Sequence, residues 1–186
     1  SAEDVSKYSE ASKAFYDSVF HFPKPTIAMI QGYCIGGGMG LAVACDIRLC
    51  EDKSRFAIPA AKLGLGYGYE GIRRLAILVG PAMVKEIFFT ARQFSAGEAQ
   101  DMGLVNRVLP PHMLAPYVDD YAKRISENAP MTMEPVKAIV QAIQDDESAR
   151  DLDALDAMVK ACFASQDYIE GRRAFMEKRK PNFTGS

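Results

Sequence analysis

The chain has 186 residues, of which 48% are hydrophobic and 25% are charged, and its formal net charge is −2. This balance gives no electrostatic reason to expect nucleic acid or an anionic membrane as a partner. No stretch reaches the roughly 20 apolar residues of a membrane span, and the four cysteines lack the spacing of a metal site. We therefore expect a globular protein without a metal centre, located in the cytoplasm.

The first half of the chain predicts a helix followed by a strand, a short helix and a second strand. Residues 1–22 are expected to be helical because apolar side chains recur at helical spacing, at Val5, Tyr8, Ala11, Phe15, Val19 and Phe22. The apolar run Thr26–Ile30 predicts a strand, and small residues over 38–45 predict a helix that packs closely on a neighbour. Ile47–Cys50 then predicts the return strand of a βαβ-type crossover.

Three consecutive glycines, Gly36, Gly37 and Gly38, precede the short helix. Backbone N–H groups at a helix start lack intrahelical acceptors, and the positive end of the helix dipole lies behind them. Such a turn can hold a developing negative oxygen without any side chain. The alternative is that the glycines serve only close packing.

A second glycine pattern follows a short expected strand over Arg55–Ile58. Gly66, Gly68 and Gly71 match G-x-G-x-x-G, which indicates dinucleotide binding only after a buried strand and with an acidic residue about 20 positions later. The segment Ala60–Leu63 is a poor strand, and no acid follows at that distance. We therefore expect no dinucleotide site here.

The remaining chain is predicted to be mostly helical. One helix should end at Gly80, and Pro81 should open another. Ser95 and Glu98 have the spacing of a capping box, which gives Glu98 a structural role. A short strand is expected over Leu104–Val108. After it we expect three or four amphipathic helices, at Leu114–Asn128, Met133–Ile143, Leu152–Ala164 and Tyr168–Arg179.

Short segments along nearly the whole chain carry a family resemblance. They are Pro25–Ala28, Gly32–Tyr33, Gly36–Gly38, Ala44–Asp46, Phe56–Pro59, Leu63–Gly64, Gly71 with Arg74–Leu75, Gly80–Pro81, Thr90–Arg92, Gly103–Val108 and Ala174–Arg179. In this order they resemble the crotonase family, also called the enoyl-CoA hydratase/isomerase family. The agreement is specific for the family and much less so for the reaction.

The resemblance implies an α/β fold with a crotonase-type ββα spiral core in residues 1–110 and a helical trimerisation region in residues 111–186. It implies a homotrimer, or a hexamer built as a dimer of trimers, that binds an acyl-CoA thioester with no cofactor besides the coenzyme A of the substrate. Gly37 would provide half of an oxyanion hole. Gly36, Gly37, Phe175 and Lys178 would contact the coenzyme A. Family members also carry a segment before the first residue, so we expect this sequence to be a fragment.

The sequence departs from the resembling hydratases at both catalytic glutamates. The first position is Gly40 and the second is Ala60, and neither can transfer a proton. Glu70 is the best replacement, and Tyr67 in the same loop could donate a hydrogen bond or a proton. The alternative for Glu70 is that it only caps a helix beginning at Gly71, where a carboxylate favours the helix dipole.

Three functions are consistent with these residues. The first is an acyl-CoA enzyme of single-acid chemistry, such as double-bond isomerisation or decarboxylation. The second is a hydratase whose acid has moved to another position. The third is a non-catalytic acyl-CoA binding or assembly protein.

Overall fold

The structure is a computed structural model that describes residues 2–186, and it describes the side chains of residue 7 and of residues 10–186. The side chains of Val5 and Tyr8, which belong to the predicted apolar stripe, lie outside this part. The chain divides into two compact units, residues 2–22 with 26–119 and residues 23–25 with 120–186. The boundary falls between Asp119 and Asp120, inside helix α6 (Pro111–Ser126). This structural boundary does not test the functional division expected between residues 110 and 111, which stays a prediction.

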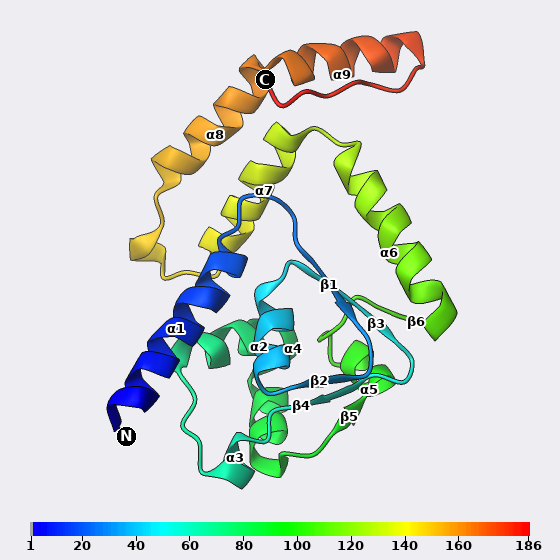
Figure 1. The fold of residues 1–186 in the computed structure, drawn as a ribbon. Coiled ribbons are helices and arrows are strands. Elements are labelled where there is room, and N and C mark those ends of the chain that lie inside the picture. The colour runs from blue at the N-terminus through cyan, green and yellow to red at the C-terminus, as the bar shows by residue number, and fades with distance from the viewer. Residues whose placement is uncertain (1) are drawn as a thin grey trace. The chain divides into compact units, whose positions relative to one another are not determined.

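The first unit contains two small sheets between which the chain alternates (Figure 1). The sheet of β1, β3 and β6 is parallel throughout, whereas β4 of the second sheet pairs parallel with β2 and antiparallel with β5. This arrangement agrees with the ββα core that the family resemblance implied. The strands are β1 (Ile27–Ile30), β2 (Tyr33–Ile35), β3 (Ile47–Glu51), β4 (Arg55–Ala57), β5 (Phe94–Ser95) and β6 (Arg107–Leu109).

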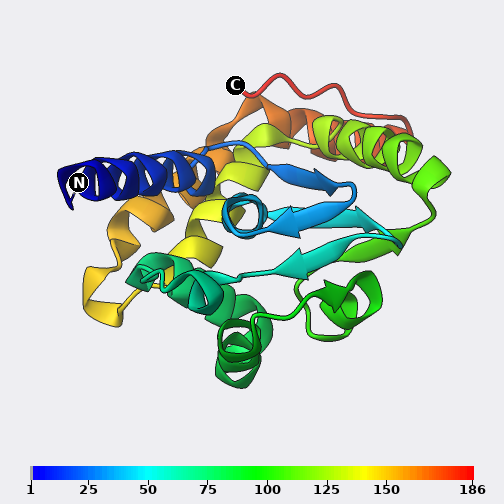
Figure 2. The ribbon, with the colours of Figure 1, turned by 60° about the horizontal axis from the view of Figure 1, so that its bottom comes forward.

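Helices surround these sheets, and Figure 2 shows α2 viewed along its axis beside the strands. The core of the unit is formed by large side chains from both sheets and from α4, among which Phe56, Phe94 and Leu75 are each 1% exposed. The described helices that belong wholly to this unit are α1 (Ala2–Phe20), α2 (Gly37–Ala44), α3 (Ala60–Leu63), α4 (Tyr69–Thr90) and α5 (Ala96–Asp101).

A buried arginine fixes the end of α2. The Arg48 side chain, only 4% exposed, donates hydrogen bonds to the carbonyl oxygens of Cys45 at 2.6 Å, Ala42 at 3.3 Å and Leu104 at 2.7 Å. Burial lowers the pKa of this guanidinium, while the neighbouring Cys45 and Asp46 act in the opposite direction. Arg48 therefore satisfies carbonyl groups at the helix end and joins α2 to the segment before β6.

Most predicted elements of this unit are confirmed. The expected strand and helix around the glycines appear as β1, β3 and α2, and β1 pairs parallel with β3. Gly80, with φ of 79°, separates two helical stretches within α4, as the Gly80–Pro81 pair predicted. Ala60–Leu63 is a helix, so the G-x-G-x-x-G pattern follows no strand.

Two differences concern short strands. The sequence analysis placed no element between the strand ending at Ile30 and the glycines, so β2 was missed. The last strand begins at Arg107 and not at Leu104, because the N–H groups of Leu104 and Val105 donate to the Ala99 carbonyl of α5, at 2.8 and 3.2 Å, and do not pair with β3. Asn106 then accepts a hydrogen bond from the Arg48 N–H at 2.8 Å, which starts the pairing with β3.

The second unit is helical, as predicted. In addition to the end of α6 (Pro111–Ser126), it contains α7 (Pro130–Ile143), the short helix η1 (Glu147–Ala149), α8 (Leu152–Ala164) and α9 (Gln166–Glu177). The terminal segment runs back beside α9 (Figure 1). Its backbone N–H groups at Thr184 and Gly185 donate to the buried Asp167 carboxylate at 2.7 and 3.0 Å.

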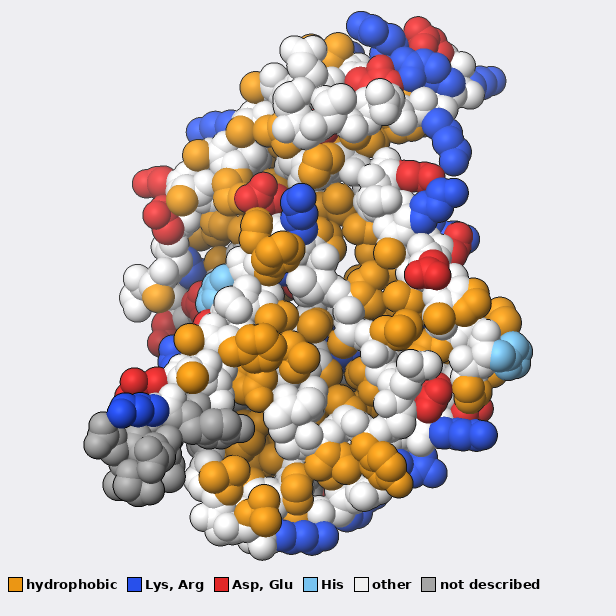
Figure 3. Space-filling model, in the orientation of Figure 1, with side chains coloured by type: hydrophobic (Ala, Val, Ile, Leu, Met, Phe, Trp, Pro, Cys, Tyr) orange, Lys and Arg blue, Asp and Glu red, His pale blue; other side chains and the backbone are white. Residues whose placement is uncertain are grey.

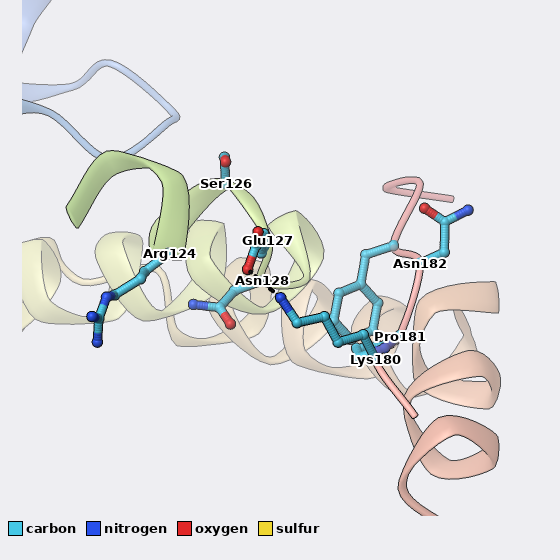
Figure 4. A pocket seen from close by; sticks show the side chains of 8 residues that line it. Arg124, Ser126, Glu127, Asn128, Lys180, Pro181 and Asn182 are labelled. Atoms are coloured by element: carbon cyan, nitrogen blue, oxygen red, sulfur yellow. Dashed lines mark ion pairs between the residues drawn. The ribbon is translucent and has the colours of Figure 1, made fainter. Parts of the chain in front are cut away.

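An open groove lies between the end of α6 and this terminal segment (Figure 4). Arg124 and Asn128 line one part, and Lys180 and Asn182 line the other. Lys180 forms an ion pair with Glu127 at 3.6 Å, so the groove presents charges of both signs.

No helix in the part of the chain that the structure describes combines the length and the apolar character that a membrane span requires.

The predicted capping box at α5 is present. Ser95 Oγ accepts from the Glu98 N–H at 3.3 Å, and the Glu98 carboxylate accepts from the Ser95 N–H at 2.8 Å. The hydrogen bond from the Ser95 backbone and the contact with Arg92 lower the pKa of Glu98 from 4.5 to about 2. The charged carboxylate therefore belongs to the folded state.

We predict that Glu98→Ala lowers the free energy of unfolding at pH 7 by about 1 kcal/mol, the usual effect of losing a capping group. The folded-state pKa lies below the unfolded value, so the stabilisation is complete above pH 4.5 and is lost as the pH falls toward 2. Urea unfolding of both proteins between pH 7 and 3 measures this difference. Asp120→Ala, which breaks the exposed pair with Arg124, is the control and should change stability by less than about 0.5 kcal/mol. A pH-independent difference would contradict the assignment.

Candidate active site

The start of α2 offers backbone N–H groups that nothing in the described part of the chain uses. Gly36 precedes the helix with φ of 57°, and its own N–H donates to the Ala57 carbonyl at 2.9 Å. No acceptor for the N–H groups of Gly37 or Gly38 is found among the described residues. These two groups, with the helix dipole behind them, can bind a negatively polarised oxygen.

Close packing does not explain two of the three glycines. A Cβ at Gly36 or Gly38 would meet no atom within 4 Å, and Gly36 is required instead by its positive φ. Gly37 and Gly38 are also exposed, so a ligand can approach this part of the backbone. The observation favours the binding interpretation of the turn over the packing interpretation.

A tyrosine from α1 lies across this turn. Tyr16 donates a hydrogen bond from its hydroxyl to the Gly37 carbonyl at 3.2 Å. A Cβ on Gly40 would lie 3.1 Å from Cζ of the same ring, and one on Gly37 would lie 3.2 Å from its hydroxyl oxygen. The space beside Gly40, where resembling hydratases carry a glutamate, is thus bordered by a phenol.

An ion pair holds α1 against α4. Arg74 is 7% exposed, and its Nη2 lies 2.6 Å from the Asp17 carboxylate. Its guanidinium also stacks 4.2 Å from the centre of the Phe20 ring. Burial raises the pKa of Asp17, but hydrogen bonds from Lys13 and Arg74 outweigh it, and the pKa lies below its ordinary value. Tyr16, next to Asp17, is therefore presented by an anchored helix.

Tyr67 comes from the loop before α4 and packs inward. Its ring meets Phe88 edge-on at 4.9 Å between centres and covers Gly71, where a Cβ would approach ring atom Cε1 to 2.6 Å. Burial raises the pKa of Tyr67, and the nearby Tyr16 raises it further. The Tyr67 phenol therefore stays protonated near neutral pH and can act as a hydrogen-bond donor.

Glu70 lies in the first turn of α4, which begins at Tyr69 and not at Gly71. Its carboxylate accepts a hydrogen bond from Arg73 Nε at 3.1 Å, and 37% of the side chain is exposed. The N-cap, Gly68, provides no side-chain cap, and Glu70 favours the helix dipole by its position. This partly exposed carboxylate remains accessible to a ligand.

The positions of the two missing acids differ in their surroundings. Gly40 lies under the Tyr16 ring, whereas Ala60 is the first residue of α3 and is 4% exposed. Hydrophobic side chains reach the surface beyond it, over α3 and the following loop (Figure 3). Leu63 and Leu65 in that stretch are 74% and 57% exposed.

The two predicted C-terminal contacts belong to the second unit. Phe175 on α9 is 82% exposed, and Lys178 ends this helix in a left-handed conformation with φ of 54°. Their role toward coenzyme A stays a prediction.

Comparison with known proteins decides the family. A model of the family "Enoyl-CoA hydratase/isomerase" matches residues 1–186. The chain belongs to the enoyl-CoA hydratase/isomerase family. It is 37% identical over 185 residues to the crotonyl-CoA hydratase of Syntrophomonas wolfei, covering 98% of this chain and 70% of that relative.

Solved structures of this family confirm the fold. An enoyl-CoA hydratase/carnithine racemase from Magnetospirillum magneticum superposes with a TM-score of 0.91 at 34% identity, covering 100% of this chain and 69% of the other. A methylmalonyl-CoA decarboxylase bound to 2S-carboxypropyl-CoA superposes with a TM-score of 0.71 at 31% identity, covering 94% and 68%. The α/β crotonase fold expected from the sequence is therefore correct. The chain spans 60% to 70% of the length of four curated relatives of this family.

Tyr16 and Arg74 are the residues of this site whose contacts the sequence did not predict. Arg74 matched the family pattern, but nothing in its spacing pairs it with Asp17. Tyr16 belongs to an amphipathic helix, and nothing in that helix predicts a contact with Gly40. The signal in the sequence was the glycine at position 40, which leaves room for a bulky neighbouring side chain.

We predict that Gly71→Ala destabilises the protein although alanine is the better helix former. The new methyl group would overlap the Tyr67 ring, which the contact with Phe88 keeps from moving freely. Gly97→Ala, also in a first helical turn but with nothing within 4 Å, is the matched control and should be neutral or stabilising by up to about 1 kcal/mol. Thermal unfolding compares the two. Equal effects of both substitutions would show that Tyr67 does not cover Gly71.

Proposed function

We propose that the protein acts on an acyl-CoA thioester and stabilises its enolate at the start of α2. The observation that carries this proposal is the pair of N–H groups at Gly37 and Gly38, which belong to exposed residues and have no acceptor among the described residues. One such donor is typically worth about 3 to 4 kcal/mol of transition-state stabilisation in an acyl-transfer site. The backbone can thus carry this part of catalysis without a side chain.

The relatives support the substrate class. The names "Crotonyl-CoA hydratase" and "Carnitinyl-CoA dehydratase" both describe enzymes of acyl-CoA thioesters. In this protein, the exposed Leu63 and Leu65 would offer apolar surface to an acyl chain. We assign further coenzyme A contacts to Gly36, Phe175 and Lys178, and we infer a homotrimer or a dimer of trimers from the family resemblance. No cofactor beyond coenzyme A is proposed.

Proton transfer requires a group other than residues 40 and 60. We assign it to Glu70, whose carboxylate is partly exposed, with Tyr67 from the segment just before it as hydrogen-bond donor. Addition of water needs one group to deprotonate the water and another to protonate carbon. A single carboxylate instead fits double-bond isomerisation, in which the same group removes a proton from one carbon and returns it to another.

Decarboxylation is the second candidate reaction. Loss of carbon dioxide from a malonyl-type thioester gives the enolate directly, so the site needs an oxyanion donor and a proton source but no strong base. The similarity of the fold to that of a methylmalonyl-CoA decarboxylase supports this second reaction. A non-catalytic acyl-CoA binding protein is the remaining alternative.

The decisive assay offers three thioesters to the full-length protein. Loss of enoyl absorbance from crotonyl-CoA reports hydration, gain of that absorbance from but-3-enoyl-CoA reports isomerisation, and release of carbon dioxide from methylmalonyl-CoA reports decarboxylation. Binding of butyryl-CoA, measured by calorimetry, is tested in parallel. Binding without any turnover would identify a non-catalytic protein, and absence of both would contradict the proposed function.

We predict that Glu70→Gln lowers kcat at least about 100-fold, the low end of the effect of a general acid or base. The affinity for butyryl-CoA should change less than twofold, because the substitution preserves the shape of the side chain. Glu86→Gln, an exposed carboxylate further along α4, is the control and should leave kcat unchanged. If Glu70→Gln retains wild-type turnover, proton transfer belongs to another group.

A further inference from the structure

Three contacts place the Tyr16 side chain over the first turn of α2. Its hydroxyl donates to the Gly37 carbonyl at 3.2 Å. A Cβ at Gly37 would lie 3.2 Å from the hydroxyl oxygen of the same phenol, and a Cβ at Gly40 would lie 3.1 Å from its Cζ. Even an alanine methyl at position 40 would press against the ring, because contacts of 3.0–3.4 Å are tighter than nearly all real Cβ contacts.

The turn that Tyr16 contacts has little stiffness of its own. Three glycines in a row lack the Cβ atoms that restrict φ and ψ, so contacts from outside add to the hydrogen bond from the Gly40 N–H to the Gly36 carbonyl at 3.0 Å in fixing the direction of their N–H groups. The Gly37 carbonyl and the Gly38 N–H belong to one planar peptide group. A hydrogen bond to that carbonyl therefore also orients the Gly38 N–H group, which has no acceptor among the described residues.

The position of Tyr16 is itself well supported. Asp17, the next residue, pairs with the buried Arg74 at 2.6 Å, and Arg74 stacks on Phe20 one turn further along α1. Tyr16 also lies near enough to Tyr67 to raise its pKa. One anchored helix thus brings a phenol to the glycine turn.

We propose that Tyr16 is a positioning residue for the reaction, holding the Gly37–Gly38 peptide so that the first turn of α2 binds the thioester oxygen, and that glycine at position 40 exists to admit its ring. This inference rests on the proposed function. It assigns to α1 a part in catalysis that involves no contact with the substrate. It also gives the absence of a glutamate at position 40 a steric reason.

Tyr16→Phe tests the hydrogen bond alone, because it keeps the ring and removes the hydroxyl. With whichever of the three thioesters the wild-type protein turns over fastest, kcat should fall about two- to tenfold, the rate equivalent of one ordinary hydrogen bond. The dissociation constant of butyryl-CoA should stay within twofold, because an oriented donor matters most for the enolate. Tyr33→Phe is the matched control, since Tyr33 is 73% exposed on β2 and should leave kcat unchanged.

Gly40→Ala tests the steric part. Alone it should lower kcat, because the methyl group displaces the phenol from Gly37. In a protein that already carries Tyr16→Ala, it should cause no further loss, because the ring that it would strike is gone. Additive effects of the two substitutions would show that Gly40 and Tyr16 act independently and would overturn this part.

The outcomes separate the two proposals. A wild-type protein that neither binds butyryl-CoA nor turns over a thioester refutes the proposed function and this inference with it. A wild-type protein that turns over a thioester, with Tyr16→Phe equally fast, leaves the proposed function standing and overturns the role of Tyr16. A loss of kcat that is matched by an equal loss of butyryl-CoA affinity also overturns it, because a merely structural contact would act on both.

Discussion

The site depends on a short helix whose two ends are fixed by different means. At the C-terminal end, the buried guanidinium of Arg48 satisfies the carbonyl groups of Ala42 and Cys45, and it reaches Leu104 as well. A buried charge of this kind is stable only when its donors are used, so the helix end and the arginine require each other. At the N-terminal end, the Gly36 N–H bonds to Ala57 of β4, and the following N–H groups stay available.

The two sheets give this helix its direction. The chain enters β1 in one sheet, crosses to β2 in the other, and returns through α2 to β3, which pairs with β1. Asp46 secures the return, because its carboxylate accepts from the Thr26 N–H at 2.7 Å and from the Thr26 hydroxyl at 2.9 Å. The start of α2 is therefore placed by strand pairing on both sides, which a flexible glycine loop alone could not achieve.

Local signals in the sequence were sufficient for most of the fold. The glycines, Pro81 and the capping box at Ser95 act through their own backbone neighbourhood, so their effect can be predicted without knowing the tertiary structure. The free N–H groups at Gly37 followed from the same reasoning. The contact of Tyr16 with Gly40 could not be predicted in this way, because it depends on how α1 packs, and that packing is set by a long-range ion pair with Arg74. The strand β2 was missed for a related reason, since three residues carry too little periodicity to indicate a strand before its partner is known.

The phenol over Gly40 also limits how this site can change over evolutionary time. A larger side chain at position 40 would need the room that the Tyr16 ring now takes. A carboxylate at position 40 would compete with the Tyr16 ring for the same space, so the residues at the two positions constrain each other.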